Sequence, residues 1–543
     1  MIIKIFLVVI LIFFIIFIFK ETKESFYTPS KNIGINTFEL SDYKVLYFDI
    51  FLKNNELFLI LPVYNKDIYF IDKIRVINNG KNLILKKKIL KVRYEPTIIL
   101  VYDFNSDNNY ITLTYNNLVK RYNLEHIKTK KKYKLTLTTL FKDDYYLFDF
   151  FYNHYSNQGV EHFYMYYNGI LNENIRNIFS NKKNVTLIEW NFKYWNDTSC
   201  EFRHHAQMGQ IHHAIYRYGK NVSEYMIFCD LDEYMLSPHR KLIQMLNSNY
   251  DTYKFCNIFS ELLDDRKKIT ELPNKFKVSK KYKFNSRSKC IHKLDSIETI
   301  SIHYGYKFLI SSPKVIESYN NCLYHFYRFG NKTRRYVCDC IIDITLMKKL
   351  LLFIHIPKTG GSYIENEFLK NGYLVGQYFK RNPIYINNYR CNNWHTPPKY
   401  MNNIDFNNYI VFTVVRDPLS RFLSEVNWDS FPKYYRNKIK DINTFISTNF
   451  KNNDINYDGD CHLVPQIEYL YDKRGKRIEN ILKQENLNED LDKFIKKYNL
   501  DIVLSYSKNN EKERNNTLND IGYENVILLK KIYKNDIDLL KSI

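Results

Sequence analysis

The chain has 543 residues, a length that suggests roughly three or four domain-sized units. Its formal net charge of +22 points to anionic partners, but the basic residues are dispersed, and we find no nucleic-acid-binding motif among them. A compact basic run, Lys128–Lys134, falls where we expect a linker. Dispersed positive charge suits clefts for phosphorylated or anionic ligands, so we expect no nucleic-acid partner.

The first twenty residues form a candidate membrane span. Ile5–Phe19 is an unbroken apolar run of fifteen residues, and Lys4 can extend its ammonium group towards the lipid headgroups. The run ends at Lys20 without a small-residue cleavage site, which favours an uncleaved signal-anchor over a cleaved signal peptide. We therefore expect a transmembrane signal-anchor over residues 1–20. The rest of the chain would then be luminal, in the ER or Golgi of the secretory pathway.

Cysteines and glycosylation sequons are compatible with that location. The chain has nine cysteines, and this odd number leaves at least one thiol over if disulfides form. In so asparagine-rich a chain, sequons arise by chance about as often as observed, so they are weak evidence for a glycoprotein. The sequon asparagines are Asn184, Asn196, Asn221, Asn331 and Asn515.

Residues 21–128 alternate short apolar runs with Asn, Asp and Gly turn residues. Regularly spaced short strands with turn residues between them predict a small β-sandwich, a stem domain in which we see no catalytic constellation. The predicted strands are residues 43–51, 57–63, 68–77, 97–102 and 110–114.

From residue 133 the pattern changes to alternating strands and helices, which predicts an α/β domain. The predicted strands are 134–140, 162–167 and 185–190, and the predicted helices are 145–159 and 204–218. A further buried-strand run, Tyr225–Cys229, ends in the acidic sequence Asp230-Leu231-Asp232-Glu233. Ligands of open α/β sheets bind at the carboxyl ends of the strands, which is where this acidic sequence falls.

Asp230 and Asp232 are two residues apart, so a bend after the strand can aim both carboxylates at one divalent cation. Such a cation would neutralise the diphosphate of a sugar nucleotide and assist its departure. An acidic turn without a ligand is the alternative. His325 is a candidate third ligand, because an imidazole complements two carboxylates for Mn²⁺, although it could instead be a buried hydrogen-bonded histidine. His303 is a weaker candidate.

Several short motifs in this region resemble glycosyltransferase family 92. They are Phe141-Lys142-Asp143-Asp144, Asp149-Phe150 with His154, Gly159-Val160, and Tyr324-His325-Phe326-Tyr327-Arg328. The resemblance implies a GT-A glycosyltransferase domain over residues 133–345, a UDP-sugar donor with galactose as the expected sugar, and usually Mn²⁺. Lys142 is then a donor-binding candidate. The base for sugar transfer stays open, with Glu233 either that base or a supporting group.

The run Leu350–Ile356 predicts a strand that leads into Pro357-Lys358-Thr359-Gly360-Gly361-Ser362 and then into a helix from Tyr363 to Lys370. Glycines let the backbone approach a phosphate, and the amides at a helix N-terminus point at it. Lys358 precedes the glycines, whereas a Walker A loop places its lysine after them. This order argues against a nucleoside triphosphatase.

A second strand, Tyr409–Val415, ends in Arg416-Asp417-Pro418, with Arg421 and Ser424 downstream. An arginine fork with a nearby hydroxyl suits a phosphate monoester. The two motifs, in this order, resemble the 5′-phosphosulfate loop and the 3′-phosphate motif of sulfotransferases. Three later segments also resemble that family: 462–466, 481–490 and 532–536.

The resemblance implies a P-loop-like α/β carbohydrate O-sulfotransferase domain over residues 348–543, with 3′-phosphoadenylyl sulfate as donor. The residues it assigns to that donor are Lys358, Thr359, Gly360, Gly361, Ser362, Arg416 and Ser424. Similarity to uronyl 2-O-sulfotransferases implies His395 as the general base. A loop histidine with no role is equally compatible with the pattern, and Glu365 is an alternative base.

Taken in chain order, the motifs predict a membrane-anchored bifunctional enzyme that adds a sugar and a sulfuryl group to carbohydrate hydroxyls. One alternative keeps only the sulfotransferase active, with the first α/β domain serving as a glycan-binding remnant. Another is a non-enzymatic adhesin built from two degraded folds.

Overall fold

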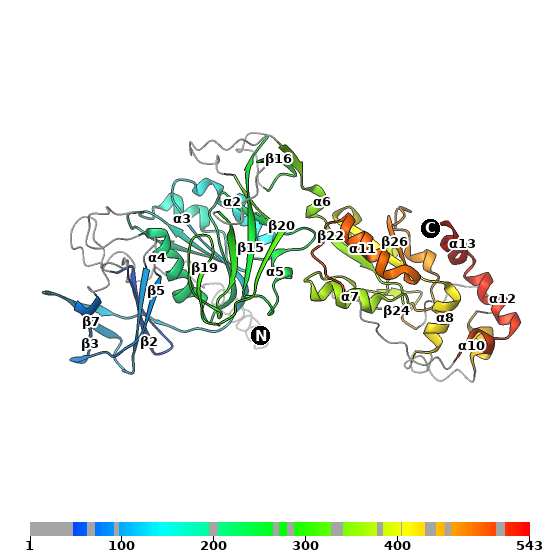
Figure 1. Cartoon of the computed structure of the whole chain (residues 1–543), viewed down its shortest axis with the longest axis horizontal. Coiled ribbons are helices and arrows are strands. Elements are labelled where there is room, and N and C mark those ends of the chain that lie inside the picture. The colour runs from blue at the N-terminus through cyan, green and yellow to red at the C-terminus, as the bar shows by residue number, and fades with distance from the viewer. Residues whose placement is uncertain are drawn as a thin grey trace, which may run out of the picture. The chain divides into compact units, whose positions relative to one another are not determined.

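The computed structural model describes residues 47–61, 71–91, 97–194, 205–263, 271–279, 287–326, 340–376, 384–402, 404–428, 441–450, 457, 459–505 and 516–543. The chain forms two compact units: residues 1–235 with 248–342 make unit 1, and residues 236–247 with 343–543 make unit 2 (Figure 1). The predicted signal-anchor lies outside the described residues. Among the described residues, no helix has the length and apolar character to cross a membrane.

Unit 1 begins with the predicted β-sandwich. One sheet has the order β5-β6-β2-β1-β9 and the other the order β4-β3-β7-β8. In β7 every second residue is buried, so Ile111, Leu113 and Tyr115 face the core between the sheets. The strands are β1 (Asp49–Lys53), β2 (Glu56–Leu61), β3 (Ile74–Asn78), β4 (Lys81–Asn82), β5 (Leu85–Lys91), β6 (Thr97–Asp103), β7 (Tyr110–Tyr115), β8 (Leu118–Asn123) and β9 (His126–Ile127).

A buried ionic network joins the sandwich to the α/β part of unit 1. Asp49 of β1 is fully buried and accepts from His213 Nε2 at 2.8 Å and from Arg217 Nη1 at 3.1 Å. Arg217 Nη2 also contacts Glu125 at 2.6 Å. These contacts, and the packing of Phe48 against Gly209, make the sandwich an integral part of the unit's core.

We expect Asp49→Asn to lower the free energy of unfolding of unit 1 by roughly 3–5 kcal/mol, because it leaves the buried Arg217 charge without its full counter-charge. Asp103→Asn is the matched control, since Asp103 is exposed in its contact with Lys86. Urea denaturation followed by tryptophan fluorescence should show a lower midpoint for the first variant alone. Equal midpoints for the two variants would show that the network contributes no stability.

The α/β part has a sheet whose strands run in the order β12-β11-β10-β13-β17-β15. The first four strands are parallel, and β17 is antiparallel to both β13 and β15. Because the chain order reverses beside β10, ligand-binding loops are expected at the carboxyl ends of β10 and β13. The strands are β10 (Tyr133–Phe141), β11 (His162–Tyr167), β12 (Val185–Glu189), β13 (Ser223–Phe228), β15 (Thr252–Glu261) and β17 (Lys289–Lys293).

The helices predicted for this part are confirmed. Residues 145–159 contain a short 3-10 turn and α2 (Phe148–Asn157), and residues 204–218 contain α4 (Ala206–His213), which continues as a π-helix over Ala214–Gly219. A further helix, α3 (Glu173–Phe179), precedes β12 and begins at Asn172, whose side chain accepts from the backbone N–H of Ile175.

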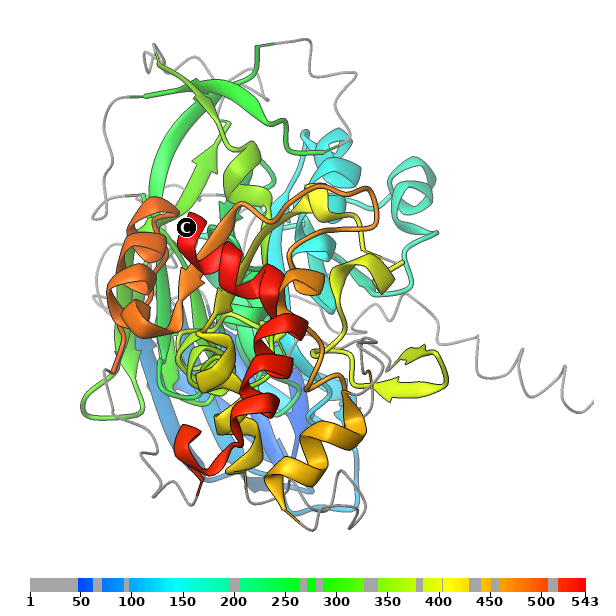
Figure 2. The ribbon, with the colours of Figure 1, turned by 90° about the vertical axis from the view of Figure 1, so that its right-hand side faces the viewer.

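Unit 2 is built on a parallel three-stranded sheet with the order β22-β25-β26. Its strands are β22 (Leu350–Ile354), β25 (Tyr409–Val415) and β26 (Asn480–Lys483). The helices α7 (Gly361–Lys370) and α11 (Leu487–Lys497) pack their apolar sides on one face through Ile364, Phe368 and Phe494. The other face is covered by chain segments around Cys391 and Val464 and by Leu539 of α13 (Lys534–Ser542). Figures 1 and 2 show α11 in orange and α13 in red.

The segment 236–247 belongs to unit 2, although it follows the acidic motif of unit 1 in the chain. His239 contacts the carbonyl oxygens of Lys349 at 2.9 Å and Tyr498 at 3.0 Å through its two ring nitrogens. Arg240 donates to the carbonyl of Asn371 and lies 4.6 Å from the ring centroid of Tyr373. These contacts hold the segment against unit 2.

Candidate active sites

The first candidate site lies where β13 ends. Asp232 and Glu233 are almost fully buried there, and Lys289 places its ammonium 3.1 Å from Asp230 Oδ2 and 3.2 Å from Glu233 Oε2. Because β17 is antiparallel to β13, the start of β17 lies beside the end of β13, and this places Lys289 next to the acidic motif. Gln207 donates to Asp230 Oδ1 at 3.0 Å. The result is an acidic cluster with one buried cation.

His325 ends β20 (Val315–His325) and lies next to this cluster. Its Nε2 is 3.5 Å from Asp232 Oδ2, and its Nδ1 is 3.7 Å from Glu233 Oε1. Burial raises the pKa of Glu233 to about 7, with Lys289 opposing the rise. Burial lowers the pKa of His325, but its hydrogen bond to Asp232 and the charge of that carboxylate outweigh burial and raise it.

Carboxylates with an imidazole are a donor set that suits a divalent cation. The structure places Asp232 beside His325, as the predicted metal site requires. Asp230 is instead directed to Lys289 and Gln207, and the donor atoms of Asp230, Asp232 and His325 do not all lie within 4.8 Å of one another among the described residues. The residues therefore fit a cation at Asp232 and His325, with Asp230 as a neighbouring carboxylate.

The other residues of the first motif set have separate positions. Lys142 is exposed just after β10, on the same sheet edge as the acidic motif. Asp149 is exposed and forms an ion pair with Lys182 at 3.2 Å. His303 contacts the carbonyl oxygen of Ser288 at 3.3 Å through Nδ1.

Two residues of α2 position the acidic motif through hydrogen bonds to the backbone that follows it. His154 contacts the carbonyl oxygen of Met235 at 2.8 Å through Nε2. The Tyr155 hydroxyl donates to the carbonyl of Glu233 at 2.9 Å and accepts from the Met235 N–H at 3.1 Å. Both therefore fix β14 (Glu233–Leu236), the strand that begins within the motif.

The second candidate site is the glycine turn after β22. Lys358 and Gly360 have positive φ angles of 66° and 92°, which bend the chain into the N-terminus of α7. A Cβ added at Gly361 would lie 2.2 Å from His355 Nε2, so glycine is required there for the histidine to pack against the turn. The Thr359 hydroxyl donates to the carbonyl of Ile356 at 2.8 Å, and Ser362 is exposed on the first turn of the helix.

Two arginines from the second motif hold this turn. Arg416 follows β25 and donates from Nη1 to the carbonyl of Lys358 at 3.2 Å. Arg421, on α8 (Pro418–Val426), donates from Nε to the carbonyl of Pro357 at 3.0 Å. Ser424 is half-buried one turn after Arg421. The structure therefore brings the two predicted donor motifs together.

Three histidines lie beside the glycine turn, and the Nδ1 of each forms a hydrogen bond with a carboxylate. The pairs are His355 with Glu365 at 2.8 Å, His395 with Asp460 at 2.9 Å, and His462 with Glu425 at 2.8 Å. The ring of His395 lies between the other two, at centroid distances of 4.9 Å and 4.7 Å. Glu365, the alternative base, is buried, and its hydrogen bond orients His355.

His395 is held in its neutral form. Burial lowers its pKa to about 3, and the nearby His355 and His462 add to this effect against the opposing influence of Asp460. With Nδ1–H donating to Asp460, the lone pair of the neutral imidazole is on Nε2. Trp428 stacks on His462 at 5.2 Å, and the Lys358 ammonium lies 4.8 Å from the Trp428 ring centroid. A chain of contacts therefore joins the loop lysine to the histidines.

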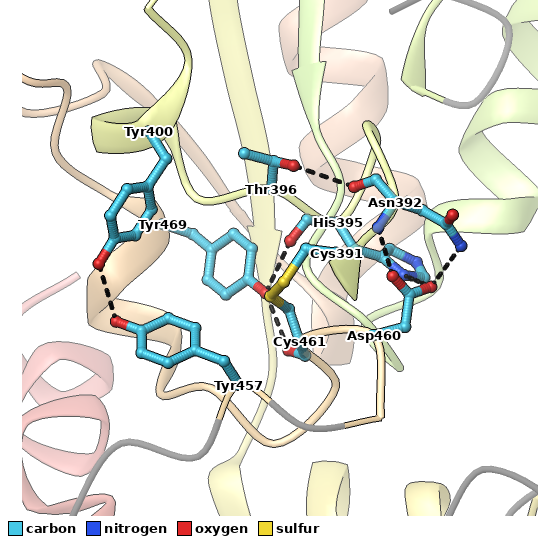
Figure 3. Close-up of a disulfide and its surroundings, with 9 residues drawn as sticks. All are labelled: Cys391, Asn392, His395, Thr396, Tyr400, Tyr457, Asp460, Cys461 and Tyr469. Carbon is cyan, nitrogen blue, oxygen red and sulfur yellow. Dashed lines mark hydrogen bonds and ion pairs between the residues drawn. A yellow bond between two sulfur atoms is a disulfide. The ribbon is translucent and has the colours of Figure 1, made fainter. Parts of the chain in front are cut away.

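A disulfide between Cys391 and Cys461 joins the two segments that carry this site (Figure 3). Cys391 is four residues before His395, and Cys461 lies between Asp460 and His462. The Tyr469 hydroxyl contacts the carbonyls of His395 at 3.1 Å and Cys461 at 3.0 Å. The disulfide and the Tyr469 hydroxyl therefore fix the positions of His395 and Asp460 relative to each other.

We expect Cys391→Ser with Cys461→Ser to lower the stability of unit 2, because the bond closes a loop with a sequence separation of 70. For a loop of this size the loss is about 4 kcal/mol on the chain-entropy argument. Differential scanning calorimetry should show a lower transition for unit 2. Cys340→Ser is the control, since Cys340 is a free, partly exposed cysteine of unit 1. If the transition temperature of unit 2 fell only in the control, the disulfide would not be what stabilises unit 2.

Comparison with known proteins finds a family model for each half of the chain. Residues 131–351 match the model of glycosyltransferase family 92, and residues 344–541 match that of the sulfotransferase family, in the fused order that the sequence motifs imply. Both are families of transferases, which supports an enzyme, and together they support a glycan-modifying one. No curated protein matches the chain.

One solved structure similar to part of the chain is the crystal structure of HddC from Yersinia pseudotuberculosis. The two are 12% identical, and the match covers 36% of this chain and 96% of that one with a TM-score of 0.21.

Proposed function

We propose that the chain is a bifunctional enzyme. Unit 1 transfers a sugar from a UDP-sugar, with galactose as the sugar we expect. Unit 2 transfers a sulfuryl group from 3′-phosphoadenylyl sulfate. In both reactions the acceptor is a carbohydrate hydroxyl. The observation that carries the proposal lies in unit 2: His355 packs against the glycine turn, and its ring is 4.9 Å from the ring of His395, which is bound to the buried Asp460.

In sulfuryl transfer, the acceptor oxygen forms a bond to sulfur while the bond from sulfur to the 5′-phosphate oxygen breaks. The hydroxyl proton goes to His395 Nε2, whose orientation Asp460 fixes through Nδ1. Negative charge builds on the departing phosphate oxygen, where the Lys358 ammonium and the amides at the start of α7 stabilise it. Arg416 and Ser424 are assigned to the 3′-phosphate, as the motif implies.

In sugar transfer, the bond from the sugar to UDP breaks and the acceptor oxygen takes the place of the diphosphate. A divalent cation, Mn²⁺ in our proposal, would neutralise that diphosphate when bound at Asp232 and His325. Lys289 holds Asp230 and Glu233 in place through its two ion pairs. Lys142 is exposed after the neighbouring strand β10, where it can bind the donor.

Donor binding tests the sulfotransferase half before any acceptor is known. Calorimetric titration of the purified full chain with 3′-phosphoadenosine 5′-phosphate should give saturable binding to one site. Adenosine 5′-phosphate is the control, because it lacks the 3′-phosphate to which Arg416 is assigned. Absence of saturable binding would favour the adhesin interpretation.

A second candidate function, a sulfotransferase with a glycan-binding remnant, has one observation in its favour. Lys289 pairs with both Asp230 and Glu233, so part of the negative charge of the acidic cluster is balanced without a metal cation. Release of UDP from UDP-sugars separates the two proposals. We expect UDP release that requires Mn²⁺ and is lost on chelation, whereas a remnant would release none while sulfation continued.

We also propose that the enzyme is a single-pass membrane protein of the ER or Golgi, with both units in the lumen. The apolar run of residues 5–19 and the Cys391–Cys461 disulfide support this, because disulfides persist in oxidising compartments. Protection of both units from added protease in sealed microsomes would test it.

A further inference from the structure

His462 has no role in the proposed sulfation step, yet it lies against the two residues that accept and orient the proton. A ring nitrogen of His462, a ring nitrogen of His395 and a carboxylate oxygen of Asp460 all lie within 4.8 Å of one another. All three side chains are buried. His355, the third histidine beside the glycine turn, belongs to no such group among the described residues. The structure therefore gathers one compact set of two imidazoles and one carboxylate.

The members of this set are fixed by contacts of their own. The Asp460 carboxylate accepts from the N–H of Asn392 and from its Nδ2 at 2.6 Å (Figure 3). His462 Nδ1 is bound to Glu425 Oε2 at 2.8 Å. Cys461, between Asp460 and His462, is tied by its disulfide. The three side chains are thus held close together before any ligand arrives.

Two imidazoles with one carboxylate suit a transition-metal ion. Open zinc sites use three protein ligands of these kinds and keep a fourth position for water or substrate. Histidine ligands commonly have a carboxylate on the second ring nitrogen, which fixes the ring, and Glu425 has this place on His462 Nδ1. The ligand atom of His462 would then be Nε2. Since divalent ions bind such sites in the order Mn²⁺ before Zn²⁺ in rising affinity, the set favours Zn²⁺.

We propose that His395, Asp460 and His462 bind Zn²⁺, and that the bound ion inhibits sulfuryl transfer by unit 2. The inference rests on the proposed function, in which His395 Nε2 accepts the hydroxyl proton. A cation on Nε2 would occupy the lone pair that takes this proton. A cation on Nδ1 would displace the proton held towards Asp460, and the neutral ring would then carry its proton on Nε2. In both cases Nε2 no longer accepts a proton.

The two units would then respond to different metals. Mn²⁺ assists sugar transfer in unit 1 under the proposed function, but it binds a site with two imidazoles more weakly than Zn²⁺ does. Sulfation should therefore continue at a Mn²⁺ concentration equal to the Zn²⁺ concentration that stops it.

The test uses the full chain with Asp232→Asn, which removes the proposed cation site of unit 1, and Zn²⁺ as the probe. Calorimetric titration should show Zn²⁺ binding that His462→Asn weakens by about tenfold or more, since loss of even a group that only orients a ligand typically costs this much. Glu425→Gln keeps the imidazole and should weaken binding in the same direction. His355→Asn is the matched control, because His355 is also a buried histidine bound to a carboxylate but lies outside the set. It should leave the affinity within about twofold.

Transfer of labelled sulfate is the second measurement. In the Asp232→Asn chain it should fall as Zn²⁺ is added and return when EDTA removes the ion, and Mn²⁺ should leave it unchanged. Binding of 3′-phosphoadenosine 5′-phosphate should be the same in every variant, which shows that unit 2 is folded in each.

Absence of Zn²⁺ binding, or equal weakening by His462→Asn and His355→Asn, would overturn the proposed site. Zn²⁺ binding through His462 without loss of sulfate transfer would overturn the proposed inhibition. If the chain bound Zn²⁺ through His462 but did not bind 3′-phosphoadenosine 5′-phosphate, the metal site would stand and the proposed function would fail.

Discussion

Replacement of Lys358 by alanine should abolish sulfation and leave sugar transfer unchanged. Lys358 is the cation of the glycine turn, held at a positive φ of 66° with its ammonium near Trp428 and its carbonyl bound by Arg416. Loss of a preorganised charge at a developing oxyanion typically lowers a rate by about 10²–10³-fold. The measurement is transfer of labelled sulfate from 3′-phosphoadenylyl sulfate, beside UDP release from the UDP-sugar in the same preparation.

Lys496→Ala is the matched control, because Lys496 is an exposed lysine of α11 in the same unit. Both activities should be retained in that variant. If Lys358→Ala eliminated both activities while the protein stayed folded, the two sites could not be independent. A shared or strongly coupled active centre would then replace the present interpretation.

Replacement of Asp232 by asparagine should have the opposite effect, with loss of sugar transfer and retention of sulfation. Asp232 is buried beside His325, so the change removes a charge that the proposed cation requires and that also holds the imidazole. We expect the rate of UDP release to fall by about 10²-fold or more, as for other losses of fixed charge in a site. UDP release in the presence and absence of Mn²⁺ is the readout.

Asp149→Asn is the control for this experiment. Asp149 belongs to the motif that resembles family 92, but it is exposed and contacts Lys182. Its replacement should leave UDP release within about twofold, since exposed ion pairs contribute little. If Asp149→Asn strongly lowered UDP release and Asp232→Asn had little effect, the sugar-transfer site would not be at the end of β13.

Much of the fold follows from local patterns. The strands β10 to β13 of the α/β part and β22 and β25 of unit 2 were predictable because each is a short apolar run. The strands β15, β17 and β26 were not predicted. The sandwich strand β5 (Leu85–Lys91) was not predicted. Its sequence Leu-Lys-Lys-Lys-Ile-Leu-Lys lacks strand-like alternation, and it forms a strand by pairing with β6.

The sites divide in the same way. The glycine turn and the acidic motif are contiguous in sequence and could be found there, whereas their partners come from distant segments. Lys289 reaches Asp230 through an antiparallel strand, and Asp460 reaches His395 across the disulfide loop. Nothing local marks such a partner, although a carboxylate beside a cysteine in a motif with a histidine was a weak indication for Asp460.

The central claim is that one chain transfers both a sugar and a sulfuryl group to carbohydrate. The most direct measurement incubates the purified full chain with a broad glycan array and both donors, and then determines the masses of the products. We expect products heavier by a hexose, by a sulfate or by both, with the hexose shift lost in Asp232→Asn and the sulfate shift lost in Lys358→Ala. Absence of either shift across the array, from protein that binds 3′-phosphoadenosine 5′-phosphate, would contradict the claim.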